Sequence, residues 1–416
     1  MVFNERQLLA IQALSDFLDS DRNFFCLSGS AGTGKTTIIK EVLKNRSGVI
    51  VSAPTHKAKR VISKATGLEA ITIHSALCLS PNMELKDFDK NNIIFDTKSV
   101  MAPIPYKVLV IDEASMLNKD LVGFIKMLKG KKVIFIGDHK QLPPVKETES
   151  LVFLDKEIEQ FRLEKIERQS EGSTIIDVCN QVLSGDYDFK ESKNVKIFSN
   201  PMSFGEEIVS RTRFGENPDY RILCFTNKCC SQWNNYVRGM VIGDYKTKLV
   251  VGEWLVCQKT VRDVCENSTD YKIETIDDCE IHGLKGYDCR LSDGWGNYTS
   301  IFVLKNESYK DFLDQERKMR RNALDAKSGQ QRGFLWRLYY KFTNSVSVLG
   351  VINDAYGNKL YDADFDYIYA QTVHKSQGST YKEVFIIKSD IMACQDRMSI
   401  MYVACSRPSE TLNILQ

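Results

Sequence analysis

The sequence lacks any long apolar run: nowhere in its 416 residues does a stretch approach the roughly 18 apolar residues that a membrane-spanning helix requires. It also lacks any low-complexity tract. Residues 1–7 place Glu5 and Arg6 ahead of any apolar block, which disfavours an export signal. We therefore expect a protein without membrane contact that stays in the cytoplasm, or in the host cytoplasm if its source is a virus.

Paired cysteines are also lacking. Twelve cysteines are scattered along the chain, and no C-x-x-C pair occurs. The nearest group, Cys224, Cys229 and Cys230, has no histidine beside it. A disulfide framework and a zinc–thiolate site are both disfavoured, and reduced thiols are expected.

A strong net charge is lacking as well, since 56 basic residues face 54 acidic ones. This near balance argues against a chain that simply coats nucleic acid, but a local basic groove remains open. Residues 309–342 carry nine Lys or Arg against four acids, and Phe334, Trp336, Tyr339 and Tyr340 lie among them. The pattern favours a surface for single strands, with Trp336 as a stacking candidate. The alternative is an amphipathic helix pair whose aromatics form a core.

A phosphate-binding loop is the most specific pattern present: Gly29-x-x-x-x-Gly34-Lys35-Thr36 follows an apolar run at 24–27 and leads into helical spacing at 38–43. Glycines let backbone N–H groups approach a phosphate chain, and the helix N-terminus adds positive potential. We therefore predict ATP and Mg²⁺, with the Lys35 amine on the β and γ phosphates and the Thr36 hydroxyl on the metal. The predicted nucleotide-binding residues of the loop are Gly29, Ser30, Ala31, Gly32, Thr33, Gly34, Lys35, Thr36 and Thr37.

The first third of the chain alternates helical and strand patterns, which predicts an α/β fold with a parallel sheet covered on both faces. Residues 108–111 are apolar at every position, and Asp112 and Glu113 follow at the carboxyl end, where open α/β sheets bind ligands. Asp112 is placed to hold Mg²⁺ through its water shell. Glu113 is placed to orient or deprotonate the attacking water.

Further motifs follow in a fixed order. They are Ala53-Pro54-Thr55-His56, Asp112-Glu113-Ala114-Ser115, the run at 137–144 (GDHKQLPP), the run at 371–378 (QTVHKSQG) and the run at 402–407 (YVACSR). Together with the phosphate-binding loop, this set resembles the superfamily 1 helicases, and within them the group B, RecD-like enzymes, including short phage helicases. The likeness extends across nearly the whole chain.

The resemblance implies a fold of two RecA-like P-loop NTPase domains with two insertions. The implied first motor domain spans 1–166, with a β-hairpin pin at 80–106. The second spans 167–250 and 345–416, and residues 251–344 form an SH3-like β-barrel insertion followed by a basic-aromatic helical tower. In the hairpin, Phe88 and Phe95 are the wedge candidates, and a plain surface loop is the alternative.

The same resemblance implies roles around the nucleotide. Gln7 matches the adenine-reading glutamine, and Gln141 the sensor of the γ phosphate. Arg168 and Arg407 match the arginines that reach across from the second motor domain to stabilise the transferring phosphoryl group. Taken alone, each arginine is more often part of a surface ion pair.

Contacts to the nucleic acid strand are also implied by resemblance, and short hydroxyl and amide side chains suit phosphate contacts without base preference. The candidates are Pro54, Thr55, His56, Thr72, His74, Thr372, His374, Lys375 and Gln377. Each histidine has a structural role as its alternative. Two departures from the family pattern stand out: Cys405 has no obvious role, and Lys59 replaces a residue that is often small.

The activity implied is that of an ATP-dependent DNA helicase, monomeric, moving 5′ to 3′ on single-stranded DNA and acting on forked duplex in replication, repair or recombination. A single-strand-binding or replication protein is a candidate further partner. A translocase that displaces proteins without efficient unwinding and an RNA-directed group B motor stay open as alternatives. A P-loop kinase is disfavoured by the motifs at 371–378 and 402–407.

Overall fold

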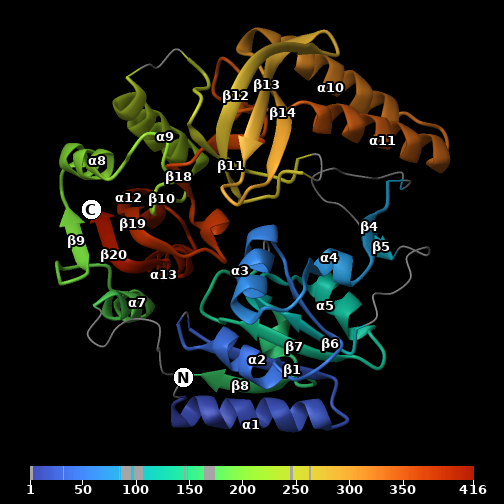
Figure 1. The fold of residues 1–416 in the computed structure, drawn as a ribbon, viewed down its shortest axis with the longest axis vertical. Helices are drawn as coiled ribbons and strands as arrows, with labels where there is room; N and C mark the ends of the chain where they lie inside the picture. The colour runs from blue at the N-terminus through green and yellow to red at the C-terminus, as the bar shows by residue number, and fades with distance from the viewer. Residues whose placement is uncertain are drawn as a thin grey trace.

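The computed structural model describes residues 3–30, 32–83, 85, 95–97, 106–144, 147, 149–163, 174–243, 247–261 and 264–416 (Figure 1). Ala31, Phe88, Arg168 and the side chain of His56 lie outside the described part, so the predictions made for them stay predictions. Two parallel sheets, one antiparallel sheet and a projecting helix pair make up the molecule. Among the described residues, no helix is long and apolar enough to cross a membrane.

Lobe 1 is a parallel sheet in the order β3-β2-β6-β7-β1-β8. Its strands are β1 (Phe24–Gly29), β2 (Val49–Ala53), β3 (Ala70–Thr72), β6 (Val108–Ile111), β7 (Lys132–Gly137) and β8 (Glu159–Leu163). Its helices are α1 (Glu5–Asp19), α2 (Lys35–Leu43), α3 (His56–Thr66), α4 (Ile73–Ala76), α5 (Lys119–Lys126) and α6 (Leu151–Leu154), with a 3-10 turn η1 (Ala114–Met116). Two hydrophobic clusters cover the two faces of the sheet, and all four residues of β6 are buried, as the apolar run predicted.

Lobe 2 is a second parallel sheet, in the order β18-β10-β19-β20-β9. Its strands are β9 (Val195–Phe198), β10 (Tyr220–Cys224), β18 (Ala370–Thr372), β19 (Tyr381–Ile387) and β20 (Pro408–Leu415). Its helices are α7 (Ile175–Leu183), α8 (Pro201–Ser210), α9 (Asn227–Ile242), α12 (Lys388–Met392) and α13 (Arg397–Cys405), with a 3-10 turn η3 (Val373–Ser376). The α/β class with parallel sheets is therefore confirmed in both lobes.

The cysteine group of lobe 2 has a structural setting. Ligand atoms of Cys224, Cys229 and Asp390 lie within 4.8 Å of one another. The Asp390 carboxylate, however, already accepts from the backbone N–H groups of Phe225 and Thr226 and from the Thr226 hydroxyl at the start of α9. Hydrogen bonds to the neighbouring cysteines and burial raise the pKa of the Cys224 thiol, which disfavours the thiolate that a metal requires.

The third sheet is antiparallel, in the order β14-β13-β12-β11-β17. Its strands are β11 (Trp254–Cys257), β12 (Asp270–Ile281), β13 (Leu284–Ser292), β14 (Tyr298–Leu304) and β17 (Phe365–Tyr367), and a small ribbon of β15 (Ile352–Asn353) and β16 (Lys359–Tyr361) lies beside it. Single bridges link Val303 of one edge strand to Ser347, and Phe365 of the other edge strand to Leu349. We name it the barrel sheet after the prediction for this segment, and the SH3-like barrel itself stays a prediction. Its strand β17 lies beyond the boundary at 345 that the sequence suggested.

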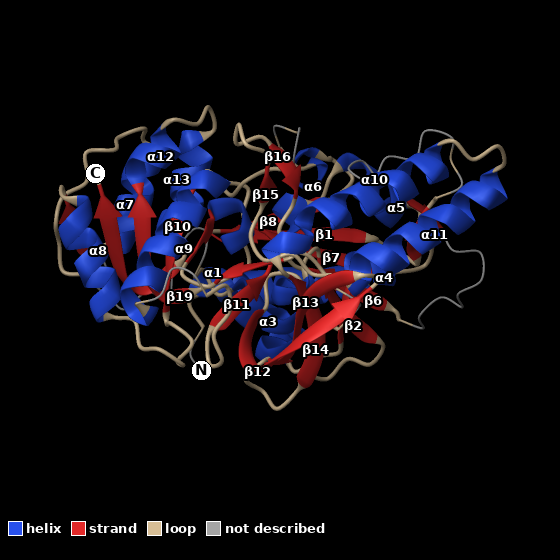
Figure 2. Cartoon of the chain, turned by 90° about the horizontal axis from the view of Figure 1, so that it is seen from above, coloured by secondary structure: helices blue, strands red, loops and turns tan. Residues whose placement is uncertain are grey.

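The helices after the barrel sheet form an antiparallel pair, α10 (Tyr309–Leu324) and α11 (Gly329–Ser345), preceded by the turn η2 (Asn306–Ser308); it projects from the molecule in Figure 2. Trp336 is only 1% exposed, and its ring centroid lies 5.1 Å from that of Tyr339. The Tyr339 hydroxyl donates to Glu316 on the facing helix at 2.7 Å. The prediction of Trp336 as a base-stacking residue was wrong, because its ring packs in the helix-pair core. Phe334 is the exposed aromatic, at 54%.

The segment predicted as a hairpin contains one pair of short strands in the described residues. β4 (Leu79–Pro81) and β5 (Phe95–Thr97) pair antiparallel, while the tip lies outside the described residues. Phe95 is partly buried, with its ring centroid 4.7 Å from that of His74, so it packs at the base of the hairpin. The wedge role of Phe95 stays a prediction. Met83 and Leu85, leading to the tip, pack against the core of the helix pair.

Candidate active site and nucleic-acid interface

The phosphate-binding loop connects β1 to α2. Gly34 adopts a left-handed backbone with φ +87°, which glycine accommodates without strain. A Cβ atom on Gly29 would lie 2.8 Å from the Leu163 carbonyl, so only glycine fits there. The Lys35 amine donates to the carbonyls of Gly29 at 2.6 Å and Ser30 at 2.9 Å, which holds it inside the loop.

Gln7 lies against this loop. Asn4 caps α1: its side chain accepts from the Gln7 N–H at 2.8 Å, and the Gln7 side chain accepts from the Asn4 N–H at 3.1 Å. The Gln7 amide donates to the Thr33 carbonyl at 3.2 Å. A Cβ atom on Gly34 would lie only 2.6 Å from this amide nitrogen. The capping box thus holds Gln7 buried at the edge of the nucleotide site.

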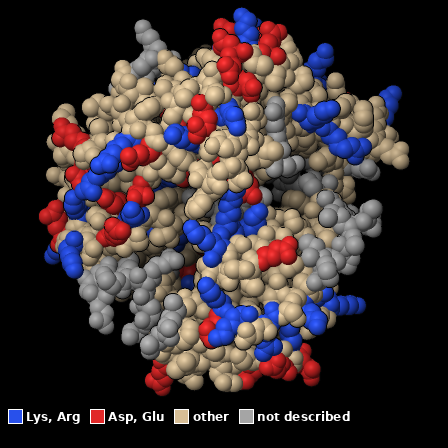
Figure 3. Space-filling view, in the orientation of Figure 1, with Lys and Arg blue, Asp and Glu red and all other residues tan. Residues whose placement is uncertain are grey.

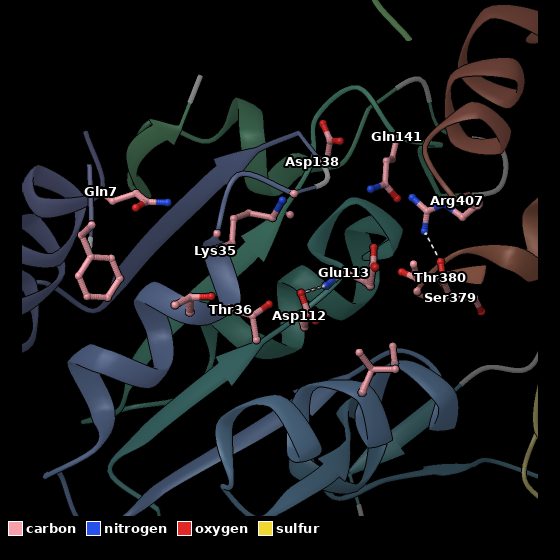
Figure 4. Close-up of a pocket in the computed structure, with 18 residues that line it drawn as sticks. Gln7, Lys35, Thr36, Asp112, Glu113, Asp138, Gln141, Ser379, Thr380 and Arg407 are labelled. Atoms are coloured by element: carbon pink, nitrogen blue, oxygen red, sulfur yellow. Dashed lines mark hydrogen bonds between the residues drawn. The ribbon is translucent and has the colours of Figure 1, made fainter. Parts of the chain in front are cut away.

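Asp112 and Glu113 follow β6 as the sequence predicted. The Glu113 N–H donates to the Asp112 carboxylate at 2.9 Å, and Glu113 has φ +54°, an uncommon value for a residue with a side chain. Strained backbone of this kind is concentrated at functional sites, where the surroundings hold it in place. With this backbone conformation, the Glu113 side chain lines the same cavity as Thr36 (Figure 4).

Asp138 and Gln141 follow β7 in the same way. Asp138 is 1% exposed, and its carboxylate accepts from the Lys140 N–H and from the Tyr402 hydroxyl, both at 3.0 Å. Tyr402 belongs to α13, so this bond joins the two lobes directly. Burial, beside Asp138, raises the pKa of the Tyr402 hydroxyl, which keeps it protonated as a donor. The Gln141 side-chain oxygen is buried without a partner in the part of the chain that the structure describes.

Arg407 follows α13 and is 4% exposed. Its guanidinium donates to the Val403 carbonyl at 3.1 Å, the Ser379 carbonyl at 3.2 Å and the Ser406 hydroxyl at 2.9 Å. All these partners are neutral. A buried cation held only by neutral acceptors is costly unless an anion joins it, which suits a phosphoryl group.

One cavity of about 470 Å³ collects these side chains between the lobes, with Gln7 at one end and Arg407 at the other (Figure 4). Its size is typical of small-ligand sites. The lining residues on which the argument depends are Gln7, Gly32, Gly34, Lys35, Thr36, Thr37, Asp112, Glu113, Asp138, Gln141, Ser379 and Arg407. These side chains fit a nucleoside triphosphate with Mg²⁺. Lys35, Arg407 and the N–H groups of the loop suit the phosphates, and Thr36 and Asp112 offer oxygen ligands to the metal.

The strand-contact candidates lie at the carboxyl ends of strands near one edge of each parallel sheet. Pro54 and Thr55 follow β2, and Thr55 caps α3. Residues 70–74 and 370–374 share the pattern Ala-x-Thr-x-His, once after the edge strand β3 and once after the edge strand β18. Corresponding hydroxyl and imidazole groups therefore recur in both lobes, where one strand could contact both in succession.

The two histidines differ in exposure: His74 is partly buried against Phe95, and His374 is exposed. Desolvation lowers the pKa of both imidazoles. Lys375 is exposed and hydrogen-bonds to Gln258 of the barrel region. The Gln377 amide nitrogen is buried without a partner among the described residues. The motif therefore combines exposed groups with one buried amide group.

Basic side chains gather in the middle of the face shown in Figure 3, between lobe 1 and the barrel sheet. Along α3, Lys59 and Arg60 both pair with Glu266, and the Lys64 amine lies 4.7 Å above the ring of Trp295. Trp295 is 75% exposed. These contacts give Lys59, which departs from the family pattern, a role in joining lobe 1 to the barrel region.

Sequence reasoning did not single out Asp138 and Ser379, which line the cavity, or Tyr402, which hydrogen-bonds to Asp138. Asp138 had a usable signal, because it follows a buried strand as Asp112 does. No sequence pattern pointed to Ser379 and Tyr402, because their positions depend on how lobe 2 packs against lobe 1. Residue spacing within one lobe does not predict that packing.

Comparison with known families gives two matches. Residues 3–198 match the model of the AAA domain, and residues 367–415 match the UvrD-like helicase C-terminal domain. The first covers lobe 1 and the start of lobe 2, and the second covers the strands and helices that carry Arg407. The two matches therefore bracket the cavity from both sides.

Similar proteins include the ATP-dependent DNA helicase dda of Enterobacteria phage T4, 28% identical over 72% of this chain and 69% of that protein. The ATP-dependent RecD2 DNA helicase of Deinococcus radiodurans is 33% identical over 38% of this chain and 22% of that protein. Among solved structures, Pif1 helicase from Candida albicans has a TM-score of 0.54 at 19% identity, covering 100% of this chain and 94% of that one. Pif1 helicase from Bacteroides in complex with ADP-AlF3 and ssDNA has a TM-score of 0.55 at 18% identity, covering 100% and 92%.

Proposed function

The chain belongs to the superfamily 1 helicases, and from this premise we propose that it is an ATP-dependent DNA helicase that moves 5′ to 3′ on single-stranded DNA and opens forked duplex. The observation that carries the proposal is the cavity between the lobes, where Lys35 and Glu113 of lobe 1 face Arg407 of lobe 2. Relatives named as ATP-dependent DNA helicases support the same reading.

Nucleotide hydrolysis needs both lobes. Lys35 and the N–H groups at the start of α2 bind the phosphate chain, and Glu113 orients or deprotonates the attacking water. Arg407 stabilises charge on the transferring group, a contribution of about 10³–10⁵ in rate for such arginines. Mg²⁺, when bound, neutralises phosphate charge, and Thr36 and Asp112 would hold it. Because Arg407 belongs to lobe 2, bound triphosphate favours a closed cleft.

Movement follows from the repeated Ala-x-Thr-x-His pattern. Closing the cleft brings the strand contacts after β3 and β18 toward each other, and reopening it moves them apart. A strand gripped alternately by lobe 1 and lobe 2 advances with each cycle. Opening a DNA base step costs about 1.4 kcal/mol on average, well within the free energy of one hydrolysis cycle. The hairpin beyond β4 would keep the separated strands apart.

The experiment compares forked DNA duplexes that carry either a 5′ or a 3′ single-stranded tail, with release of a fluorescent strand as the readout. ATP-dependent release only from the 5′-tailed duplex is the expected result. Release only from the 3′-tailed duplex would contradict the polarity. The variant Lys35→Ala serves as the control, because it removes the phosphate contact and should release nothing.

Two alternatives belong to the same test. A translocase without useful unwinding would hydrolyse ATP on single-stranded DNA and displace a bound protein, yet release no strand from either duplex. An RNA-directed motor would do so on RNA tails only. Trp295, exposed beside the basic residues of α3, offers a ring for stacking in any of these cases, since base stacking on an aromatic is sequence-tolerant.

A further inference from the structure

Ser379 lies in the loop between η3 and β19, at the lobe 2 wall of the cavity. It is 2% exposed, and its side-chain oxygen has no hydrogen-bond partner among the residues that the structure describes. Its backbone is fully engaged: its N–H donates to the Ser376 carbonyl at 3.0 Å, and its carbonyl accepts from Arg407 at 3.2 Å. The hydroxyl alone is left over. Burial of a hydroxyl without a partner is costly, so its position needs an explanation.

The loop is pressed against lobe 1 at this point. Gly378 has φ +72°, and a Cβ atom built on it would lie 3.1 Å from the Ala58 side chain and 3.7 Å from the Glu113 carboxylate. A side chain is therefore poorly accommodated at residue 378. The close approach holds the next residue, Ser379, at the seam between the lobes, on the same wall as Arg407 (Figure 4).

The surroundings identify the missing partner by its charge. Arg407 lies on the same wall as Ser379 and bonds to its carbonyl, while Lys35 lines the cavity from lobe 1, and Gln141 buries an unpartnered oxygen in the same lining. A hydroxyl in a cavity lined by cations suits an anionic oxygen, because hydrogen bonds to an ionised acceptor are the strong ones. In a nucleoside triphosphate whose phosphate chain is bound by this loop, the terminal phosphoryl group is the part that extends toward lobe 2.

We propose that Ser379 is a further contact residue for the terminal phosphoryl group of a nucleoside triphosphate. Its hydroxyl donates to a terminal phosphoryl oxygen while its carbonyl orients the Arg407 guanidinium. Through one residue, lobe 2 therefore recognises the third phosphate and aims the arginine at it. This inference rests on the proposed function and names a contact within the same site.

The test compares two nucleotides in the variant Ser379→Ala, using dissociation constants for Mg-ADP and for a nonhydrolysable Mg-ATP analogue. We expect affinity for the triphosphate analogue to fall about 10-fold and affinity for ADP to change less than about 2-fold, since one charge-assisted hydrogen bond is lost. Ser379→Cys keeps nearly the same size with a weak donor, and should lose triphosphate affinity in the same direction. If the alanine variant folds poorly, the two dissociation constants can still be measured with the cysteine variant.

The matched control is Ser376→Ala. Ser376 is a fully buried serine at the end of η3, just before this loop, and its hydroxyl already donates to the Val373 carbonyl at 2.7 Å. This variant should lose thermal stability but keep the ratio of the two affinities. If both nucleotides weaken equally in Ser379→Ala, or neither does, the inference is overturned while the proposed function stands. A wild-type chain that binds neither nucleotide would overturn both.

Discussion

Buried side chains have different surroundings in the cleft between the lobes and in the helix pair α10–α11. In the cleft, Gln141 and Ser379 each bury a polar atom that has no hydrogen-bond partner within the described ranges. In the helix pair, Trp336 and Tyr339 bury their rings against each other, and the Tyr339 hydroxyl donates to Glu316 at 2.7 Å. The cleft therefore offers polar atoms to a ligand, whereas the helix pair packs its aromatic rings against one another.

The difference separates ligand sites from core. Leaving a buried polar atom unpaired costs about 1–3 kcal/mol, and a fold sustains several such losses in one place mainly where a ligand compensates them. A buried aromatic pair stabilises the fold without any ligand. Composition alone could not distinguish these regions, because both are rich in residues typical of binding sites.

The largest effect is expected in the cleft, from Arg407→Ala. Removing the only lobe 2 arginine that lines the described cavity should lower the rate of ATP hydrolysis by about 10³-fold or more, as loss of such an arginine does elsewhere. Steady-state hydrolysis on single-stranded DNA measures the change. Arg397→Ala, an exposed arginine at the start of the same helix, is the control. Similar rates in both variants would contradict the role of Arg407.

In the helix pair, the expected effect is on stability. Trp336→Ala should lower the free energy of unfolding by about 3–5 kcal/mol, because it empties a packed core position. Phe334→Ala, on the same helix but exposed, should change it by less than about 0.5 kcal/mol. Chemical denaturation measures both.

Binding of single-stranded DNA sharpens this prediction. Trp336→Phe keeps an aromatic core and should bind DNA as the wild type does. Should this variant instead weaken DNA binding while its stability is unchanged, the ring would have a direct contact and the comparison between the two regions would fail. Phe334→Ala reports whether the exposed aromatic of this helix contacts bases.

The sequence predicted the features that depend on short stretches of chain. The strand at 108–111, the loop from Gly29 to Thr36 and the acids Asp112 and Glu113 are where their patterns indicated, because burial on both faces requires an apolar run and phosphate binding requires glycine. The role of Trp336 failed, because an aromatic at helical spacing packs equally well in a core. The turn pattern likewise did not reveal that His74 would lie beside Phe95.

Tyr402→Phe tests the bond that joins the lobes. It removes the donor to the buried Asp138 carboxylate, and a lost hydrogen bond to a charged group costs about 1.5–3 kcal/mol. The expected results are a lower unfolding midpoint and a higher KM for ATP, since the closed cleft loses a contact. A double-mutant cycle with Asp138→Ala isolates the pair, and additive effects would mean that the two side chains do not interact. Tyr356→Phe, at a residue that is 92% exposed, is the control.

The smallest effect concerns a carboxyl outside the cleft, Asp366 on β17. Burial raises its pKa from 3.8 to about 6, so the folded protein keeps this proton at pH values where the unfolded chain has released it. The folded state then binds more protons between these values, and stability falls as pH rises through this window. Here a proton compensates the buried group, as a ligand does in the cleft. Asp366→Asn removes the dependence.

We therefore expect the wild type, relative to Asp366→Asn, to lose about 1 kcal/mol more stability at pH 8 than at pH 5, measured by urea unfolding at both values. Asp362→Asn, an exposed acid of the same segment paired with Lys359, is the matched control and should follow the wild type at both values. An equal difference between wild type and Asp366→Asn at the two pH values would mean that burial does not raise the pKa of Asp366 in the folded protein. The barrel region would then resemble the cleft, where polar and charged groups converge, more than the helix pair, where aromatic rings pack against one another.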